Sequence, residues 1–180
     1  MSWNIDAGHS QVNFSAKHMG IMTVRGHFTD VQATLNFDED DFTASSVEAS
    51  IRAGSLVTND AKRDDHLRSA DFLDVERYPT ITFKSTGIER ADHDHYRMAG
   101  DLTIHGVTRP VTLDVVYSGQ VKDPWGNARA GFSAEMTIKR SDWGLTWNAV
   151  LETGGLVVSD DIKIQLEVEA VKPVELAAAA

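Results

Sequence analysis

Apolar and polar residues alternate along most of the chain, so that large hydrophobic residues recur at every second position. Near the N-terminus Val12, Phe14 and Ala16 are separated by polar residues, and the same spacing runs through 162–170. A period of two places each set on one face of a β-strand. The pattern predicts eight strands, rich in β-branched and aromatic residues, at about 10–18, 23–37, 46–53, 80–90, 95–105, 110–121, 128–140 and 161–171.

Strands that follow one another through short turns pair as an antiparallel meander, and about eight of them can close into a barrel. We therefore expect an all-β fold, an extended antiparallel barrel of about eight strands. Residues 3–6 would add an edge strand. A chain of 180 residues suits one domain, expected over 1–175, with 176–180 as a short disordered tail.

Residues 59–68 lack the alternation and predict one short helix with Asn59 as its N-cap. Asp64 and Arg68 are spaced i,i+4 within it, but such a pair contributes only a few tenths of a kcal/mol. The helix would instead be held by packing of Ala61 and Leu67.

A second irregular segment, 141–159, combines large apolar residues with three glycines. We expect a partly ordered flap in which Trp143, Leu145 and Trp147 gate the interior. The interior itself has two interpretations, because a barrel of this size either packs solid or holds one ligand. The mixture of large rings with Ala on the inward face, together with the flap, favours a cavity.

Some strand ends carry polar residues in register with the inward face, namely His18, Arg109 and Arg140. A cation there could meet an anionic head group, since Arg offers a planar donor fork to phosphate or carboxylate. Alternatively, the arginines pair with Asp142 or Asp114 and close the end of the barrel.

The charge and composition of the chain narrow the classes of partner. Its 17 basic and 27 acidic residues give a formal net charge of −10, which disfavours nucleic acid. The absence of Cys excludes disulfides and thiolate sites. Residues 1–6 do not resemble a secretory signal and no run approaches the roughly 18 apolar residues of a transmembrane helix, so the expected location is cytoplasmic.

The candidate catalytic and metal-binding motifs are weak. His93 and His95 lie on a predicted turn without a third ligand, and Asp38–Asp41 lacks the Gly and Glu of a calcium loop. His9 and Ser10 follow Asp6, but no G-x-S-x-G occurs. We therefore expect no enzymatic activity, no catalytic or metal-ligating residues and no required cofactor.

A set of motifs distributed over residues 3 to about 165 resembles the YceI-like family of isoprenoid-binding proteins. The matching segments are Trp3-x-Ile5-Asp6-x-x-His9-Ser10-x-Val12-x-Phe14, His18, Val24-x-Gly26-x-Phe28, His66-Leu67-x-Ser69-x-Asp71-Phe72-x-Asp74, Tyr78-Pro79-x-Ile81-x-Phe83, Gly100-x-Leu102-Thr103-Ile104-x-Gly106-Val107-Thr108-x-Pro110-Val111, Gly131-Phe132 and Arg140-Ser141-Asp142-Trp143-Gly144-Leu145. Residues 1–6 do not resemble the signal peptide that many members of the family carry, and Trp143 and Leu73 stand where Phe is common in the family.

The resemblance implies a lipocalin-like barrel, closed at one end by a helix, with a hydrophobic tunnel for a polyisoprenoid, a quinone tail or a fatty-acyl chain. The leading hypothesis is thus a non-enzymatic protein that binds, stores or transports such a lipid. The alternatives are an enzyme acting on a lipid head group and a filled barrel that serves as a stress or interaction module. A homodimer is compatible with the family and with edge strands, although no sequence feature fixes it.

The residues expected to contact the lipid follow from the inward alternation and the flap. The tunnel and its gate are assigned to Phe14, Phe28, Phe83, Met98, Leu102, Leu113, Phe132, Met136, Trp143, Leu145 and Trp147, and the head group to His18, Arg109 and Arg140.

Overall fold

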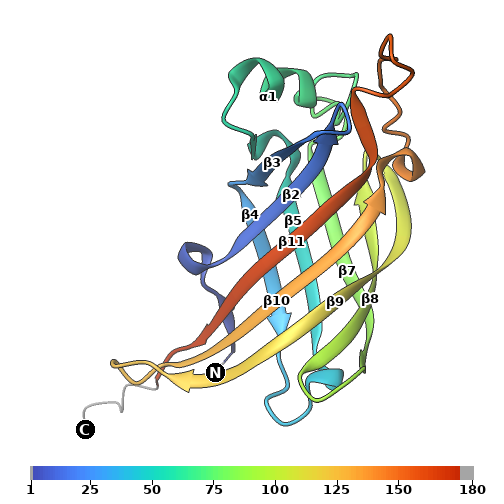
Figure 1. Ribbon diagram of the computed structural model, residues 1–180. Coiled ribbons are helices and arrows are strands. Elements are labelled where there is room, and N and C mark those ends of the chain that lie inside the picture. Colours follow the sequence, from blue (N-terminus) through green and yellow to red (C-terminus); the bar gives the residue numbers. More distant parts are fainter. Residues whose placement is uncertain (1, 175–180) are drawn as a thin grey trace, which may run out of the picture.

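The computed structural model describes residues 2–174, in which one antiparallel sheet of eleven strands dominates (Figure 1). The strands are β1 (Asn4–Ile5), β2 (Gln11–His18), β3 (Met22–Phe28), β4 (Val31–Asn36), β5 (Ser46–Arg52), β6 (Leu56–Val57), β7 (Thr80–Arg90), β8 (His95–Ile104), β9 (Val107–Lys122), β10 (Ala128–Lys139) and β11 (Val158–Lys172). The helices are α1 (Ala61–Arg68) and the short 3-10 helices η1 (Ala7–His9), η2 (Phe42–Ala44), η3 (Ala53–Ser55) and η4 (Arg140–Trp143). The predicted all-β antiparallel barrel with one α-helix is confirmed, with more strands than the eight expected.

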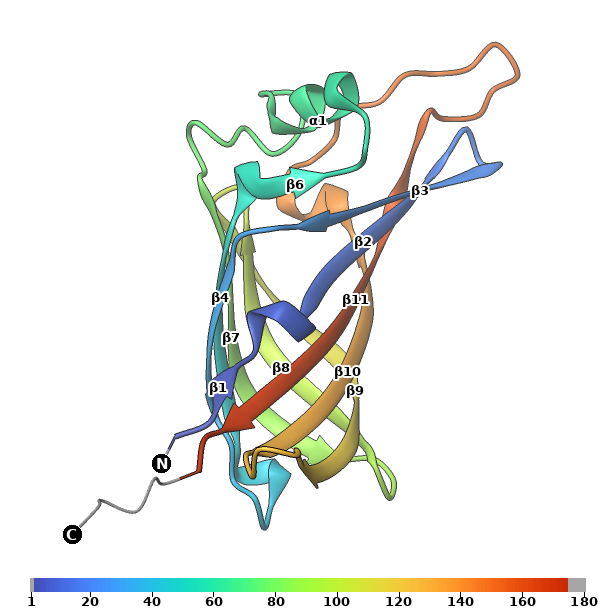
Figure 2. The ribbon, with the colours of Figure 1, turned by 90° about the vertical axis from the view of Figure 1, so that its left-hand side faces the viewer.

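The sheet curls around an interior in the order β4-β5-β7-β8-β9-β10-β11-β2-β3-β6, and β1 pairs with β11 beside this path (Figure 2). Near α1 the barrel is joined at a corner, where Thr29 donates to the Ser55 carbonyl and Arg52 to the Asp30 carbonyl. Further along, β4 pairs only with β5 among the described strands, and β1 packs against it. The expected closed barrel is therefore wrong in one respect: along β4 the barrel is closed by packing against β1 and not by hydrogen bonds between strands.

The predicted strand at 23–37 proves to be two strands, β3 and β4, separated by Thr29 and Asp30. The inward parity changes there, from Phe28 to Val31, which is the sequence signal for the break. The edge strand expected at 3–6 is confirmed as β1.

The N-cap lies one residue later than predicted, because Asp60 caps the helix and accepts a hydrogen bond from the Arg63 N–H at 3.0 Å. Asn59 instead adopts a left-handed φ of 62°. The expected pair of Asp64 with Arg68 is wrong: the Asp64 carboxylate accepts from Thr58 N–H and Oγ1 at 2.9 and 2.5 Å.

The helix is attached to the barrel by polar contacts as well as by packing. The Arg68 guanidinium donates to the carbonyls of Gly54 and Leu56, each at 2.9 Å. Leu67 faces the interior, as expected, whereas Ala61 is exposed and contributes little packing. Together these contacts hold α1 across one end of the barrel (Figure 2).

The opposite end of the interior is filled by aromatic side chains. The rings of Phe37, Phe42, Tyr117 and Phe132 lie 5.1 to 6.1 Å apart in edge and stacked arrangements. Such aromatic contacts stabilise the fold by more than the burial of their apolar area alone. One end of the barrel is thus a solid core, and any internal space lies between this aromatic cluster and α1.

No helix within the described part of the chain is long and apolar enough to cross a membrane. The expected tail at 176–180 lies outside the described residues.

Candidate binding cavity

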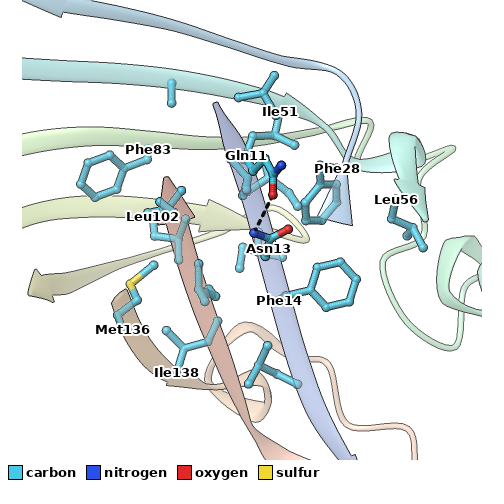
Figure 3. A pocket seen from close by; sticks show the side chains of 18 of the residues that line it. Gln11, Asn13, Phe14, Phe28, Ile51, Leu56, Phe83, Leu102, Met136 and Ile138 are labelled. Carbon is cyan, nitrogen blue, oxygen red and sulfur yellow. Dashed lines mark hydrogen bonds between the residues drawn. The ribbon is translucent and has the colours of Figure 1, made fainter. Parts of the chain in front are cut away.

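A cavity of about 590 Å³ occupies the barrel interior and is lined by nearly every strand (Figure 3). Its volume lies within the range of small-molecule and cofactor sites. The apolar lining comes from the inward parity of the strands, as in Phe28 of β3, Ile51 of β5 and Met136 of β10. The hollow interior confirms the interpretation of the pattern that favoured a cavity over a solid core.

Nearly all the residues assigned to the tunnel and its gate line this cavity. They are Phe14, Phe28, Phe83, Met98, Leu102, Leu113, Phe132, Met136, Leu145 and Trp147. Trp143 does not line it. Trp143 is the last residue of η4; its side chain is 2% exposed, and its indole N–H donates to the Leu102 carbonyl at 3.1 Å. The expected gate therefore reduces to Leu145 and Trp147.

Small residues create the internal space. Ala33 of β4 and Ala49 of β5 are paired across the sheet and both line the cavity. Next to them, Phe83 packs its ring against Gly100 of β8, where a Cβ would come within 2.4 Å of the ring. Glycine lets the ring lie against the neighbouring strand, so that the centre of the barrel stays open.

Aromatic contacts join α1 to the segment that follows η4. The ring of His66 lies 4.7 Å from that of Trp147 and 5.0 Å from that of Phe72, nearly perpendicular to both. His66 Nε2 also bonds Asp71 Oδ2 at 2.8 Å. Because His66, Phe72 and Trp147 all line the cavity, this cluster forms the wall between the cavity and the α1 end.

The three head-group candidates occupy different environments. His18 is half-buried and lines the cavity at the end of β2. Arg140 also lines it, and its guanidinium donates to the backbone carbonyls of Ser159 at 2.9 Å and Leu145 at 2.7 Å. Arg109 is exposed, bonds the Asp142 carbonyl and is not among the lining residues. The structure thus brings His18 and Arg140 to the cavity and leaves Arg109 outside.

The burial of Arg140 has an electrostatic consequence. Desolvation lowers the pKa of the guanidinium, but arginine starts so high that the group stays charged. Its charge is met by backbone carbonyls, and Asp160 is the nearby acid that opposes the shift. The carboxylate pairing considered for the arginines is therefore replaced, at Arg140, by carbonyl contacts that fix the segment after η4.

The fully buried polar side-chain atoms of the barrel are internally satisfied. Within the described residues, no buried side-chain nitrogen or oxygen lacks a hydrogen-bond partner. A ligand deep in the cavity would meet hydrocarbon surface and would not need to supply polar groups. The cavity is therefore suited to an apolar chain.

Apart from Ser10, the remaining polar motifs lie outside the cavity lining. Ligand atoms of Asp6, His9 and Glu169 lie within 4.8 Å of one another, but Arg129 bonds both carboxylates, so that a cation already occupies the cluster. The Asp38 carboxylate accepts from the N–H groups of its own acidic turn. His93 lies on the β7–β8 turn and His95 is the first residue of β8, and both are exposed.

Solved structures share this architecture over almost the whole chain. The YceI protein of Campylobacter jejuni superposes with a TM-score of 0.76 at 34% identity, covering 88% of this chain and 90% of that one. BcnA of Burkholderia cenocepacia gives a TM-score of 0.79 at 25% identity, covering 92% and 99%. A polyisoprenoid-binding domain from Saccharophagus degradans gives 0.69 at 15% identity, covering 96% and 99%, and at that identity shows a common fold alone.

Sequence comparison extends the likeness to proteins of other bacteria. A UPF0312 protein of Pectobacterium atrosepticum is 43% identical over 164 residues, which are 91% of this chain and 82% of that protein. The protein YceI of Escherichia coli O157:H7 is 47% identical over 137 residues, 76% of this chain and 71% of that protein. The YceI-like domain matches residues 3–170. The chain therefore belongs to the YceI-like family.

Proposed function

We propose that the protein binds a long apolar chain in the barrel cavity and stores or carries it without chemical change. The candidate ligands are a polyisoprenoid, an isoprenoid quinone tail and a fatty-acyl lipid. The observation that carries the proposal is the cavity of about 590 Å³ with hydrocarbon walls. Each Å² of apolar ligand surface buried there contributes about 25 cal/mol before ordering costs.

The solved relatives add support of a weaker kind. The Saccharophagus degradans domain of the same fold is described as polyisoprenoid-binding. The residues that would meet such a chain here are large and adaptable, as at Met98 and Met136, whose flexible side chains fit irregular ligands. These features favour a polyisoprenoid over a rigid polycyclic ligand.

The chemistry of the lining favours binding over catalysis. Among the described lining residues the ionisable side chains are Lys17, His18, Arg63, His66 and Arg140, with no Asp or Glu. A reaction on a lipid head group would need an acid and a base that converge on the substrate. The third hypothesis, a filled barrel acting as an interaction module, does not account for the internal space.

Extraction of the purified protein with organic solvent, followed by mass spectrometry, tests the proposal directly. We expect a long-chain lipid in near-stoichiometric amount, or stoichiometric binding of added polyprenol by the lipid-free protein. A lipid-free sample that also fails to bind polyprenol and long-chain fatty acid would overturn the proposal.

The head-group part of the proposal concerns His18 and Arg140, which reach the cavity from β2 and η4. We expect His18→Leu to reduce the preference for polyprenyl phosphate over polyprenol severalfold, because a donor near the phosphate is lost. Arg109→Leu is the matched control and should leave the preference unchanged, since Arg109 lies outside the cavity. Equal preferences in wild type and His18→Leu would remove His18 from the head-group site.

A further inference from the structure

Two loops project beyond the barrel at the α1 end and expose large apolar side chains. One is the β2–β3 turn and the other is the loop between η4 and β11 (Figures 1 and 2). The exposed side chains are Met19, Ile21, Met22, Val150 and Leu156, which are 44 to 79% exposed. We call these five residues the tip surface.

The two loops are joined to each other and to the cavity. The Met19 N–H donates to the Val157 carbonyl at 2.9 Å, and His18 pairs with Val158 in the sheet. His18, Val157 and Val158 line the cavity, so the tip surface begins within one residue of the lining. An apolar ligand leaving the cavity at this end would meet apolar side chains first.

The tips are depleted of charge in an otherwise charged chain. Charged residues make up 24% of the sequence, yet none occurs from Met19 to Val24, and Glu152 is the single one from Trp143 to Val158. Removing a charged side chain from water is costly, whereas apolar side chains gain by it. The composition of both loops is therefore typical of a surface that becomes buried in an apolar environment.

Met19 in the β2–β3 turn is a bulky apolar residue at a position where the turn conformation favours a different residue type. Met19 and Gly20 have φ values of 54° and 71°, and the Ile21 N–H donates to the His18 carbonyl at 3.1 Å, as in a type I′ turn. Asn is the favoured residue at the first of these positions, and a non-glycine side chain there is strained. The fold gives no reason for methionine at this position, since the side chain is exposed.

From these observations we propose that the tip surface inserts into the interfacial region of a lipid bilayer, with the α1 end of the barrel facing the membrane. The inference rests on the proposed lipid-binding function, because docking there would let the cargo pass between bilayer and cavity without crossing water. Narrow projecting loops suit insertion of a few side chains. A stable dimer with a second copy of the chain, by contrast, would require about 800 Å² of buried surface on each partner.

Vesicle co-sedimentation tests the inference with the full chain and vesicles of phosphatidylcholine. The test variant is Ile21→Ser/Met22→Ser/Val150→Ser, and the matched control is Val121→Ser/Trp125→Ser, which changes residues 68 and 77% exposed near the β9–β10 turn. We expect the tip variant to lower the vesicle partition coefficient about tenfold or more, because each substitution removes apolar groups from the bilayer. The control should partition as wild type does. Phosphatidylglycerol vesicles should not bind more strongly, given the net charge of −10.

A single substitution separates docking from folding. Met19→Asn should weaken vesicle binding severalfold while leaving stability to urea unchanged or increased, since Asn suits the turn. Wild-type protein that contains lipid but does not bind vesicles would overturn the inference and leave the proposed function intact. So would a tip variant that loses self-association in sedimentation velocity yet binds vesicles normally. Wild-type protein that binds vesicles but neither contains a lipid nor takes up added polyprenol or long-chain fatty acid would instead count against the proposed function.

Discussion

The ring of Phe14 lies against Gly26 on the neighbouring strand, with which it is paired in register. A Cβ on Gly26 would come within 2.4 Å of Phe14 Cζ, closer than real side chains approach. The glycine therefore determines where the ring lies, and with it the width of the cavity beside β2.

We expect Gly26→Ala to destabilise the protein by about 1–3 kcal/mol, the usual cost of overpacking, because the ring must turn away from β3. Urea denaturation measures the change. Gly87→Ala is the control: a Cβ there meets no atom within 4 Å, so stability should change little. Equal losses of stability in Gly26→Ala and Gly87→Ala would show that the contact with the Phe14 ring does not limit the size of the residue at position 26.

The strands and the lining residues could be predicted because burial on one face leaves a period of two in the sequence. Phe28 and Met136, for example, line the cavity as their parity requires. The rule failed at Arg109, which is paired with Leu102 but extends to η4 at the strand end. The assignment of Trp143 to the gate rests on the irregular flap and not on alternation, and Trp143 lies within a 3-10 helix after β10, where a period of two does not give the side-chain direction.

The helix boundary shows a different limit of sequence reasoning. Asn59 and Asp60 are both good N-caps, and nothing local selects between them. The choice depends on tertiary contacts: Thr58 is held by Asp64, which turns Asn59 into a left-handed conformation and leaves Asp60 to cap. Contacts of that kind leave no periodic signal in the sequence.

Filling the cavity should reduce ligand capacity without unfolding the barrel. Ala49 lines the cavity and lies between Ala33 and Phe83 on neighbouring strands. We expect Ala49→Phe to lower the bound polyprenol severalfold, because the ring takes the space of the chain, with little loss of stability. Ser50→Phe places the same ring on the exposed face and should bind normally. Titration with polyprenol compares them, and equal capacities would contradict a ligand in this space.

The contact of Trp147 with His66 should slow ligand exchange, because the two rings join the segment after η4 to α1 at 4.7 Å. We expect Trp147→Ala to speed release of bound polyprenol to acceptor vesicles roughly tenfold, with a smaller effect on affinity. The rate is measured by transfer of a fluorescent polyprenyl probe. Trp125→Ala, at an exposed tryptophan, should release at the wild-type rate. An unchanged rate in Trp147→Ala would exclude a gating role.

At the end of the barrel away from α1, Arg129 of β10 bonds Glu169 of β11, Asp6 at the start of η1 and Asp123 in the β9–β10 turn. Burial alone would raise the pKa of Asp123, but hydrogen bonds from Arg129, Asn127 and backbone N–H groups outweigh it and lower the pKa to about 2. A carboxyl whose pKa is lower in the folded state stabilises the fold above its unfolded pKa of about 4. That stabilisation is lost as pH falls from about 4 to 2.

We therefore expect Asp123→Asn to be less stable than wild type at pH 7, with a difference that narrows steadily between pH 4 and pH 2. The amide keeps the shape of the side chain but cannot gain from the charge of Arg129, so the difference isolates the ionised form. Urea denaturation at pH 7, 4 and 2.5 measures it. Asp101→Asn, at an exposed carboxylate of β8, should differ little from wild type at each pH. A difference between Asp123→Asn and wild type that stayed constant from pH 7 to 2.5 would mean that shape, and not charge, makes Asp123 stabilising.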